Sequence, residues 1–186
     1  TKALLGEKFK ELVEKKGFEK LTIKMITDAA GVIRPTFYNY FQDKYEVMEW
    51  LLWEDVFKEV SELMEQERGM ESLKLLFRKF EEDKTYYEKV FEVTGQNSFE
   101  EMLYGQIFNM EEILVKHHPL KHLSNMPHVD EKVFLEFHAI SLVNGLKYWL
   151  IRESKNISAG DAMEFYQYMM SHSILDLLDI ENTEKK

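Results

Sequence analysis

The chain of 186 residues contains no cysteine, which excludes disulfide bonds and cysteine-ligated zinc sites. Prolines are few, at positions 35, 119 and 127, and no stretch alternates apolar and polar residues as a strand does. No apolar run approaches the roughly 18 residues that a membrane span needs, and the first residues are too charged for a signal peptide. We therefore expect a soluble, cytoplasmic, all-α protein with no membrane partner.

Signatures of catalysis are also missing. The sequence has no glycine-rich phosphate loop, no HExxH motif and no nucleophile elbow. Its many carboxylates fall on helix faces that we expect to be solvated. We expect neither an enzyme nor a bound cofactor.

The segment 117–130 contains four of the six histidines and two of the prolines, and it is predicted to be a long loop. His117, His118 and His122 have side chains that bind metals, but adjacent histidines point apart. A solvated loop is the favoured interpretation, and no metal site is expected.

Negative charge is concentrated away from the amino-terminal part. The net charge of the whole chain is −10. Residues 1–50 hold nine Lys and Arg against eight Asp and Glu, a net charge of +1, whereas the remainder holds fifteen against twenty-six, a net charge of −11. This asymmetry would keep the carboxyl-terminal part away from a polyanion and leave the approach to a local cationic face.

Apolar periodicity predicts about nine helices, with a small module at residues 1–46 and a larger domain at 47–186. The later helices are expected over the ranges 44–66, 71–83, 86–94, 98–116, 131–153 and 159–179. Gly69 is expected to break the first of these. Three of them begin with N-cap pairs: Asp43 with Glu46, Ser98 with Glu101, and Ser158 with Asp161.

Residues 22–44, TIKMITDAAGVIRPTFYNYFQDK, predict two short helices joined by a tight turn. Thr22 is a suitable N-cap, and Gly31 stands where a left-handed turn is needed. The first helix is expected to bury Met25, Ile26, Ala29 and Ala30, and the second to bury Phe37 and Phe41. The side chains left facing outward are Arg34, Pro35, Thr36, Tyr38, Asn39 and Tyr40, with Lys44 just beyond.

The outward side chains suit duplex DNA. Arginine can donate two hydrogen bonds to a guanine edge and asparagine can pair with adenine, whereas tyrosine hydroxyls and lysine ammoniums suit phosphates. The alternative is an ordinary helical hairpin with a solvated polar face, but two exposed tyrosines are unusual on such a face. The pattern favours a sequence-specific DNA-binding protein.

The segments LTIKMITDAAGV, RPTFYNYF and DKYEV resemble the TetR family of transcriptional regulators over about the first fifty residues. The resemblance implies a helix-turn-helix head that binds double-stranded DNA. It places Thr22, Tyr38, Tyr40 and Lys44 on the phosphate backbone. It places Lys24, Arg34, Pro35, Thr36 and Asn39 at or near the base edges. Ile33 departs from the family pattern, which has a capping serine at this position; its loss costs on the order of 1 kcal/mol.

The last two predicted helices have apolar residues on more than one face, and the surplus needs a partner. The resemblance implies that these helices form a two-fold dimer interface. The interface residues would include Leu146, Trp149, Phe165, Met169 and Met170, with Gly145, Ala139 and Ser141 allowing close backbone approach. Burial within one chain is the alternative.

Aromatic residues recur at helical spacing between positions 77 and 108, and the residues alone favour plain core over a ligand pocket. The resemblance implies a pocket among these helices for a small apolar or aromatic effector, floored by Tyr104, Phe108 and His138. His138 on its own is more often a hydrogen-bonded core residue than a ligand contact. TGQNSFEEML and SLVNGLKYWL further resemble the branch of the family that regulates dihydroxyacetone kinase operons.

The expected function is transcription regulation by a homodimer on a palindromic operator, as a repressor released by an effector. Two alternatives remain open: activation through a protein co-regulator, and an interaction module that has lost DNA binding.

Overall fold

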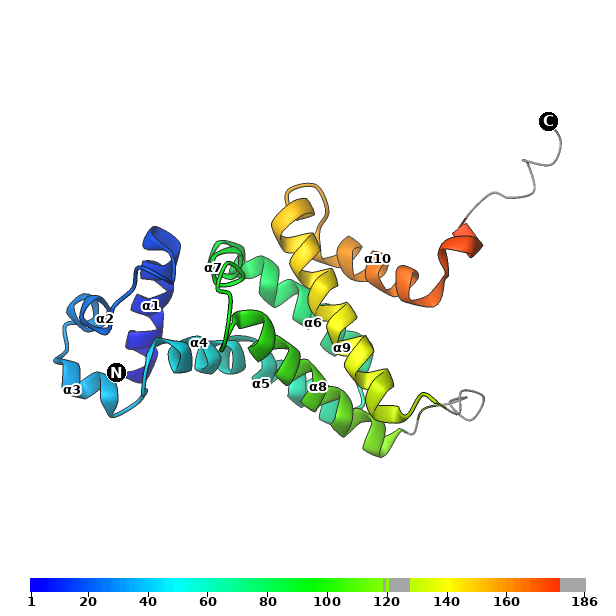
Figure 1. Cartoon of the computed structure of the whole chain (residues 1–186), viewed down its shortest axis with the longest axis horizontal. Helices are drawn as coiled ribbons and strands as arrows, with labels where there is room; N and C mark the ends of the chain where they lie inside the picture. The colour runs from blue at the N-terminus through cyan, green and yellow to red at the C-terminus, as the bar shows by residue number, and fades with distance from the viewer. Residues whose placement is uncertain (119, 121–127, 178–186) are drawn as a thin grey trace.

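The computed structural model describes residues 1–118, 120 and 128–177, and over these ranges the chain is helical and has no strand. The predicted nine helices are present when segments that continue one another are counted together. Figure 1 shows a small group of helices at one end of the long axis and a larger group at the other. We call residues 1–43 the head and residues 58–177 the body.

The head consists of α1 (Lys2–Lys16), α2 (Ile23–Ala30) and α3 (Arg34–Tyr38). Its core is formed by apolar side chains from all three helices, among them Leu5, Phe9, Val13, Ile26 and Phe37.

The predicted inner faces of the head are largely confirmed. Phe37 and Phe41 are buried, with their ring centroids 5.7 Å apart. Ala29 was predicted to be inward but is exposed, and Thr27 is buried instead. Burial of Thr27 is tolerated because its hydroxyl donates to the Lys24 carbonyl at 3.0 Å.

A single helical rod leads from the head into the body. It comprises α4 (Lys44–Leu52), η1 (Trp53–Phe57) and α5 (Lys58–Glu65), close to the predicted range 44–66. Asp43 starts the rod as predicted, because its carboxylate accepts hydrogen bonds from the backbone of Tyr45 at 2.8 Å and of Glu46 at 2.9 Å. The middle segment, η1, is a π-helical turn that periodicity does not predict.

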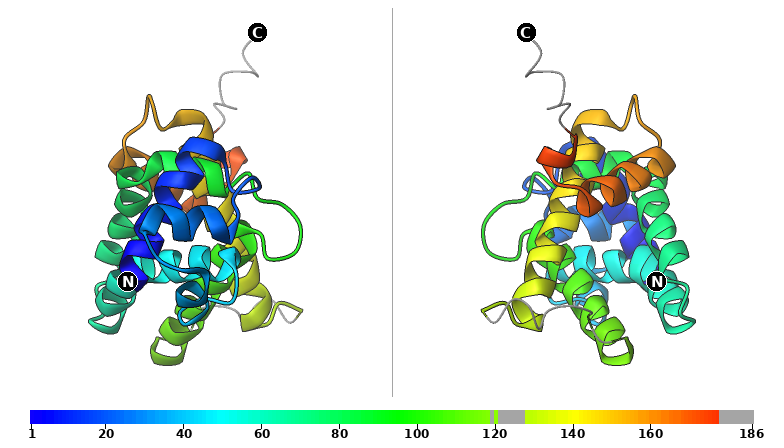
Figure 2. Two further views of the ribbon diagram at one scale, coloured as in Figure 1. Left: turned by 90° about the vertical axis from the view of Figure 1, so that its left-hand side faces the viewer. Right: turned by 90° about the vertical axis from the view of Figure 1, so that its right-hand side faces the viewer.

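The body adds five more helices, whose hydrophobic core is continuous with that of the head. They are α6 (Gly69–Glu82), α7 (Lys84–Val90), α8 (Phe99–His117), α9 (Glu131–Tyr148) and α10 (Ala159–Ser171). A second π-helical turn, η3 (Trp149–Glu153), extends α9 to the predicted end. Seen from the end away from the head, α9 and α10 lie in front (Figure 2).

Two predicted helix boundaries are wrong. Gly69 begins α6, and the break lies just before it, where Glu67 has a positive φ of 61°. The last helix ends at Ser171 instead of 179, because His172 is extended. A short turn, η4 (Ile174–Leu177), follows.

Candidate nucleic-acid interface

The turn between α2 and α3 has the local structure that the sequence predicts. The Thr22 hydroxyl accepts a hydrogen bond from the Met25 backbone at 3.3 Å and caps α2. Gly31 is left-handed, with φ 66° and ψ 30°, and the next amide, that of Val32, donates to the Thr27 carbonyl at 3.0 Å. The chain therefore turns sharply and presents α3 on the surface of the head.

The start of α3 is uncapped by any side chain. Ile33 occupies the N-cap, makes no side-chain hydrogen bond to the helix, and is 71% exposed. A large apolar side chain so open to water is available for contact with a partner, such as a thymine methyl group in a major groove.

The outer face of α3 carries the predicted contact residues. Arg34, Pro35 and Asn39 are exposed, and Thr36 is half-buried. Two tyrosines accompany them: Tyr38 is 47% exposed, and Tyr40, in the turn after α3, is 40% exposed. Phe37 and Phe41 are buried in the core of the head and hold α3 in place, so the polar side chains on its outer face start from a fixed backbone.

Within this face, Arg34 and Tyr38 contact each other. The guanidinium donates to the Tyr38 hydroxyl from Nη2 at 2.9 Å and from Nε at 3.3 Å. The guanidinium carbon lies 5.6 Å from the centre of the phenol ring. This spacing of four residues orders the arginine on the surface before any partner binds.

The two lysines of the predicted set both interact with groups of the head. The Lys24 ammonium pairs with Asp28 at 2.5 Å, and both side chains are largely exposed. The Lys44 ammonium donates to the backbone carbonyls of Phe18 at 3.0 Å and Glu19 at 3.4 Å. Lys44 thus ties the first turn of α4 to the segment after α1, a role that the motif alone does not indicate.

The predicted interface residues separate into two groups. Leu146 is fully buried and Trp149 is 4% exposed, and both lie in the core of the same chain. The assignment of Leu146 to a subunit interface is corrected, since this side chain presents no surface to a second chain. Trp149, although largely buried, still lines an apolar groove beside α10. Phe165, Met169 and Met170 are exposed, at 59%, 41% and 42%.

The exposed apolar surface on α9 and α10 is nevertheless extensive. Beside the three residues of α10 it includes Val133, Phe134, Phe137, Ile140, Tyr148 and Ile151. Gly145 contributes to packing within the chain: a Cβ there would lie 3.0 Å from the Tyr166 ring. An apolar groove of about 260 Å³ runs between the two helices, beside Gly145 and Tyr166.

The predicted pocket residues lie near a buried polar cluster. The Nδ1 atom of His138 lies 2.7 Å from a carboxylate oxygen of Glu111, which is only 6% exposed. The hydrogen bond with Glu111 raises the pKa of His138, against the opposing effect of burial. The second oxygen of Glu111 and the hydroxyl of Tyr166 are buried without partners.

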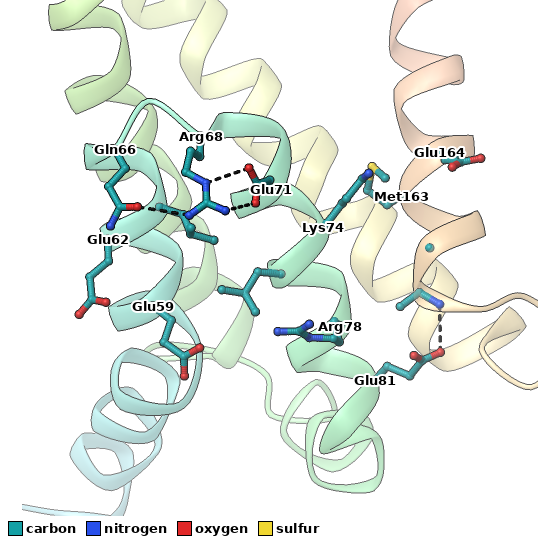
Figure 3. A pocket seen from close by; sticks show the side chains of 14 residues that line it. Glu59, Glu62, Gln66, Arg68, Glu71, Lys74, Arg78, Glu81, Met163 and Glu164 are labelled. Carbon is teal, nitrogen blue, oxygen red and sulfur yellow. Dashed lines mark hydrogen bonds and ion pairs between the residues drawn. The ribbon is translucent and has the colours of Figure 1, made fainter.

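Tyr104 and Phe108 lie on α8 with their rings stacked, 5.9 Å between centroids, and both are half-buried. A cavity of about 780 Å³ lies between α5, α6 and α10 (Figure 3), and neither Tyr104, Phe108 nor His138 lines it. It is lined by charged side chains such as Glu59, Lys74 and Arg78, unlike the apolar pocket that was predicted.

Sequence reasoning missed Glu111 and Tyr166, although a signal for Glu111 exists. Leu103, Ile107 and Val115 are buried at intervals of four, and Glu111 occupies the missing place in that stripe. A carboxylate in an apolar stripe predicts a buried partner. For the histidines at 117–130, His122 lies outside the described residues. Among the described residues no group of three or more possible metal ligands gathers.

No helix in the described part of the chain is long and apolar enough to cross a membrane.

Comparisons with known proteins give matches in both parts of the chain. Residues 10–50 match a model described as bacterial regulatory proteins, tetR family. Residues 67–171 match a transcriptional regulator C-terminal region.

One relative and two solved structures illustrate the similarity. The chain is 28% identical over 91 residues to the HTH-type dhaKLM operon transcriptional activator DhaS of Lactococcus lactis subsp. lactis (strain IL1403). That match spans 49% of the chain and 49% of the relative, so about half the length of each. A protein of Syntrophomonas wolfei str. Goettingen, described as a TetR-family transcriptional regulator, superposes with a TM-score of 0.67 at 21% identity, covering 96% and 97% of the two chains.

The second solved structure is Thermus thermophilus FadR, described as a TetR-family transcriptional repressor, in complex with lauroyl-CoA. It superposes with a TM-score of 0.57 at 18% identity and covers 94% of this chain and 95% of its own. At such identities the two structures show that the fold is shared.

Proposed function

Because the chain belongs to the TetR family and is a DNA-binding transcription regulator, we propose that it is a repressor that binds a palindromic operator as a homodimer and is released by an effector. The observation that carries the proposal is the outer face of α3, where Arg34, Asn39 and two tyrosines stand exposed over buried phenylalanines. Since bacterial DNA lies in the cytoplasm, we expect the protein there.

The exposed groups divide by chemistry into two sets. Arg34 and Asn39 would read base edges, with Lys24, Pro35 and Thr36 beside them. The phosphate backbone would be held by the hydroxyls of Thr22, Tyr38 and Tyr40 and by the Lys44 ammonium. Ile33 would add an apolar contact at the start of α3.

A homodimer would be formed through α9 and α10. Phe165, Met169 and Met170 present apolar surface that water disfavours, and it continues onto the exposed side chains of α9. A single α3, only five residues long, offers little contact area, so two copies on successive grooves would be needed for affinity.

An effector site is proposed at the cluster of Glu111, His138 and Tyr166. A buried carboxylate oxygen and a buried hydroxyl without partners cost free energy that a ligand's polar group would recover. The surroundings are aromatic, since Phe134 stacks on His138. Of these residues Tyr166 lines the apolar groove of about 260 Å³ between α9 and α10, so a small, largely apolar molecule with one hydroxyl or amine group would approach the cluster through that groove.

The alternative function is activation together with a protein co-regulator. It is supported by the relative from Lactococcus lactis, which is 28% identical over the aligned residues and is described as an operon activator. Repression and activation both require operator binding. They differ in whether the bound protein lowers or raises transcription.

Genome-wide occupancy combined with transcript levels in a deletion strain tests the proposal. If the protein represses, transcripts next to occupied sites rise when the gene is deleted. A fall in those transcripts supports the activator. An absence of occupied sites overturns DNA-dependent regulation altogether.

A further inference from the structure

One lysine of the head makes its ionic contacts outside the head. The Lys10 ammonium lies 3.0 Å from a carboxylate oxygen of Asp55 and also pairs with the carboxylate of Asp83. Lys10 belongs to α1, Asp55 to the π-helical turn of the connecting rod, and Asp83 to the junction of α6 and α7. The three side chains thus join the head, the rod and the body at one point.

This arrangement differs from that of the other ion pairs. Most of them link residues three or four apart on one helix, such as Lys8 with Glu11. Among the pairs that the structure describes, those of Lys10 alone connect α1 to the rod and to the body, over separations of 45 and 73 residues respectively. Exposed pairs within one helix stabilise little. A pair between two units, in contrast, is lost when the two units change their relative orientation.

The side chains of this bridge are partly shielded from water, Lys10 more than Asp55 and Asp83. The Lys10 side chain is 20% exposed, and its ammonium lies 5.4 Å from the centre of the Tyr86 ring. Tyr86 is buried, has an unpartnered hydroxyl, and packs edge-on against Phe9 of the head. Burial lowers the pKa of Lys10, but the hydrogen bond to Asp83 and the charge of Asp55 more than offset this, so Lys10 stays charged.

The orientation of α1 determines where α3 lies. α1 packs along α7 of the body and also against α2 and α4, and α2 in turn packs on α3. A change in the angle between α1 and the body therefore moves the recognition face as a unit. In a dimer, it changes the distance between the two recognition faces, which must match successive major grooves about 34 to 36 Å apart.

We propose that Lys10 is a positioning residue for operator binding, which bridges Asp55 and Asp83 and thereby sets the spacing of the two heads. The inference rests on the proposed function, because spacing matters only to a dimer that binds two half-sites. Any effector that repacks the α6–α7 junction would act on DNA affinity through this bridge.

Parallel selection from a library of random duplexes tests the proposal. Wild type, Lys10→Met and the control Lys8→Met are each used to enrich binding sites. Lys8→Met is matched because Lys8 pairs only within α1, with Glu7 and Glu11. The readouts are the half-site sequence, the distribution of spacer lengths between half-sites, and the affinity for the best site.

We expect Lys10→Met to enrich the same half-site as wild type with a broader range of spacers. Its affinity for the wild-type spacing should fall about five- to tenfold or more, the size of a typical coupling between two sites. Lys8→Met should match wild type. The conservative variant Lys10→Arg keeps a positive charge between Asp55 and Asp83 and should retain a narrow spacer distribution, which separates positioning from loss of folding.

Other results overturn the proposal. If Lys10→Met folds and has the spacer distribution and affinity of wild type, the bridge does not determine the spacing of the two heads. A changed half-site sequence shows that Lys10 acts within the head. If Lys10→Met fails to fold, Asp83→Asn takes its place with the same expectations. A wild-type protein that enriches no sequence overturns the proposed function, and this inference with it.

Discussion

Arg34 donates two hydrogen bonds to the hydroxyl of Tyr38, the shorter at 2.9 Å, and both side chains stand on the exposed face of α3. An arginine held in this way has already lost part of its side-chain entropy, which lowers the cost of ordering it on DNA. The tyrosine can meanwhile offer its hydroxyl proton to a phosphate. We therefore propose that the pair links base reading by Arg34 to backbone positioning by Tyr38.

The first prediction concerns base readout. Arg34→Ala should lose about 1 to 3 kcal/mol of binding free energy on the cognate site and relax the preference at one base pair. Tyr40→Phe and Lys44→Ala should weaken binding to all sequences alike, since they affect backbone contacts and head geometry. Competition titrations against operator variants at fixed salt measure both. Equal losses on cognate and random DNA would remove Arg34 from the base-reading set.

The second prediction concerns assembly. Phe165→Glu should convert a dimer into monomers, because a charge would lie in the apolar surface of α10. Leu4→Lys, at another exposed apolar residue but on α1 of the head, is the matched control and should remain dimeric. Light scattering at micromolar concentration distinguishes these states. If the wild-type protein is a monomer at this concentration, the inference that it binds a symmetric operator as a homodimer fails.

Leu146 gives a different expectation. Because this side chain is fully buried, Leu146→Asp should unfold the body instead of dissociating subunits. The sequence leaves this distinction open, since both faces of α9 are apolar and periodicity does not tell which face meets the same chain.

The third prediction concerns a glycine in α1. A Cβ on Gly6 would lie 2.6 Å from the Trp50 ring and 3.1 Å from Leu51, so Gly6→Ala should destabilise the head by about 1 to 3 kcal/mol. Gly105 in α8 is the matched control: nothing lies within 4 Å of its added Cβ, and Gly105→Ala should stabilise by about 0.5 to 1 kcal/mol. Denaturant titrations measure the free energy of unfolding of each variant. Equal changes for Gly6→Ala and Gly105→Ala would contradict the packing of α1 on α4.

The fourth prediction concerns pH. The pKa of His138 is raised in the folded protein by its hydrogen bond with Glu111, although burial opposes the shift. The resulting stabilisation is fully present below the ordinary histidine value of about 6.5 and is lost as the pH rises through the raised pKa. Tyr166 and Phe134 also face the imidazole, and neither changes charge in this range.

His138→Gln should therefore cost most stability in mildly acidic solution and less as the pH increases. His172→Gln, at an exposed residue just after α10, serves as the control. The measurement is the free energy of unfolding at a series of pH values. A pH-independent difference between wild type and His138→Gln would show that the pair with Glu111 carries no charge.

Local signals in the sequence predicted much of the fold. Caps such as Thr22, Asp43 and Ser98 and the left-handed Gly31 act through neighbouring backbone groups, so the residues that determine them lie within a few positions. The exposed face of α3 was also predictable from neighbouring residues, because the buried pair Phe37 and Phe41 shows which side of the helix faces inward.

The features that the sequence left open depend on distant contacts. The bridge from Lys10 to Asp83 spans 73 residues and has no local signature. The π-helical turns keep the helical period on either side, so periodicity does not reveal them. The early end of the last helix, at Ser171, lies within an apolar pattern that continues beyond it, and only the extended His172 marks the break.

The symmetry of the DNA site bound by the wild-type protein tests the central claim most directly. Selection from random duplexes, followed by sequencing and titration at several salt concentrations, measures it. A dimer that reads DNA through α3 should enrich two inverted half-sites one helical turn or a multiple apart, about 10 to 10.5 base pairs per turn, with affinity that falls steeply as salt increases. Enrichment of no sequence, or of one isolated half-site without a symmetric partner, would contradict the account.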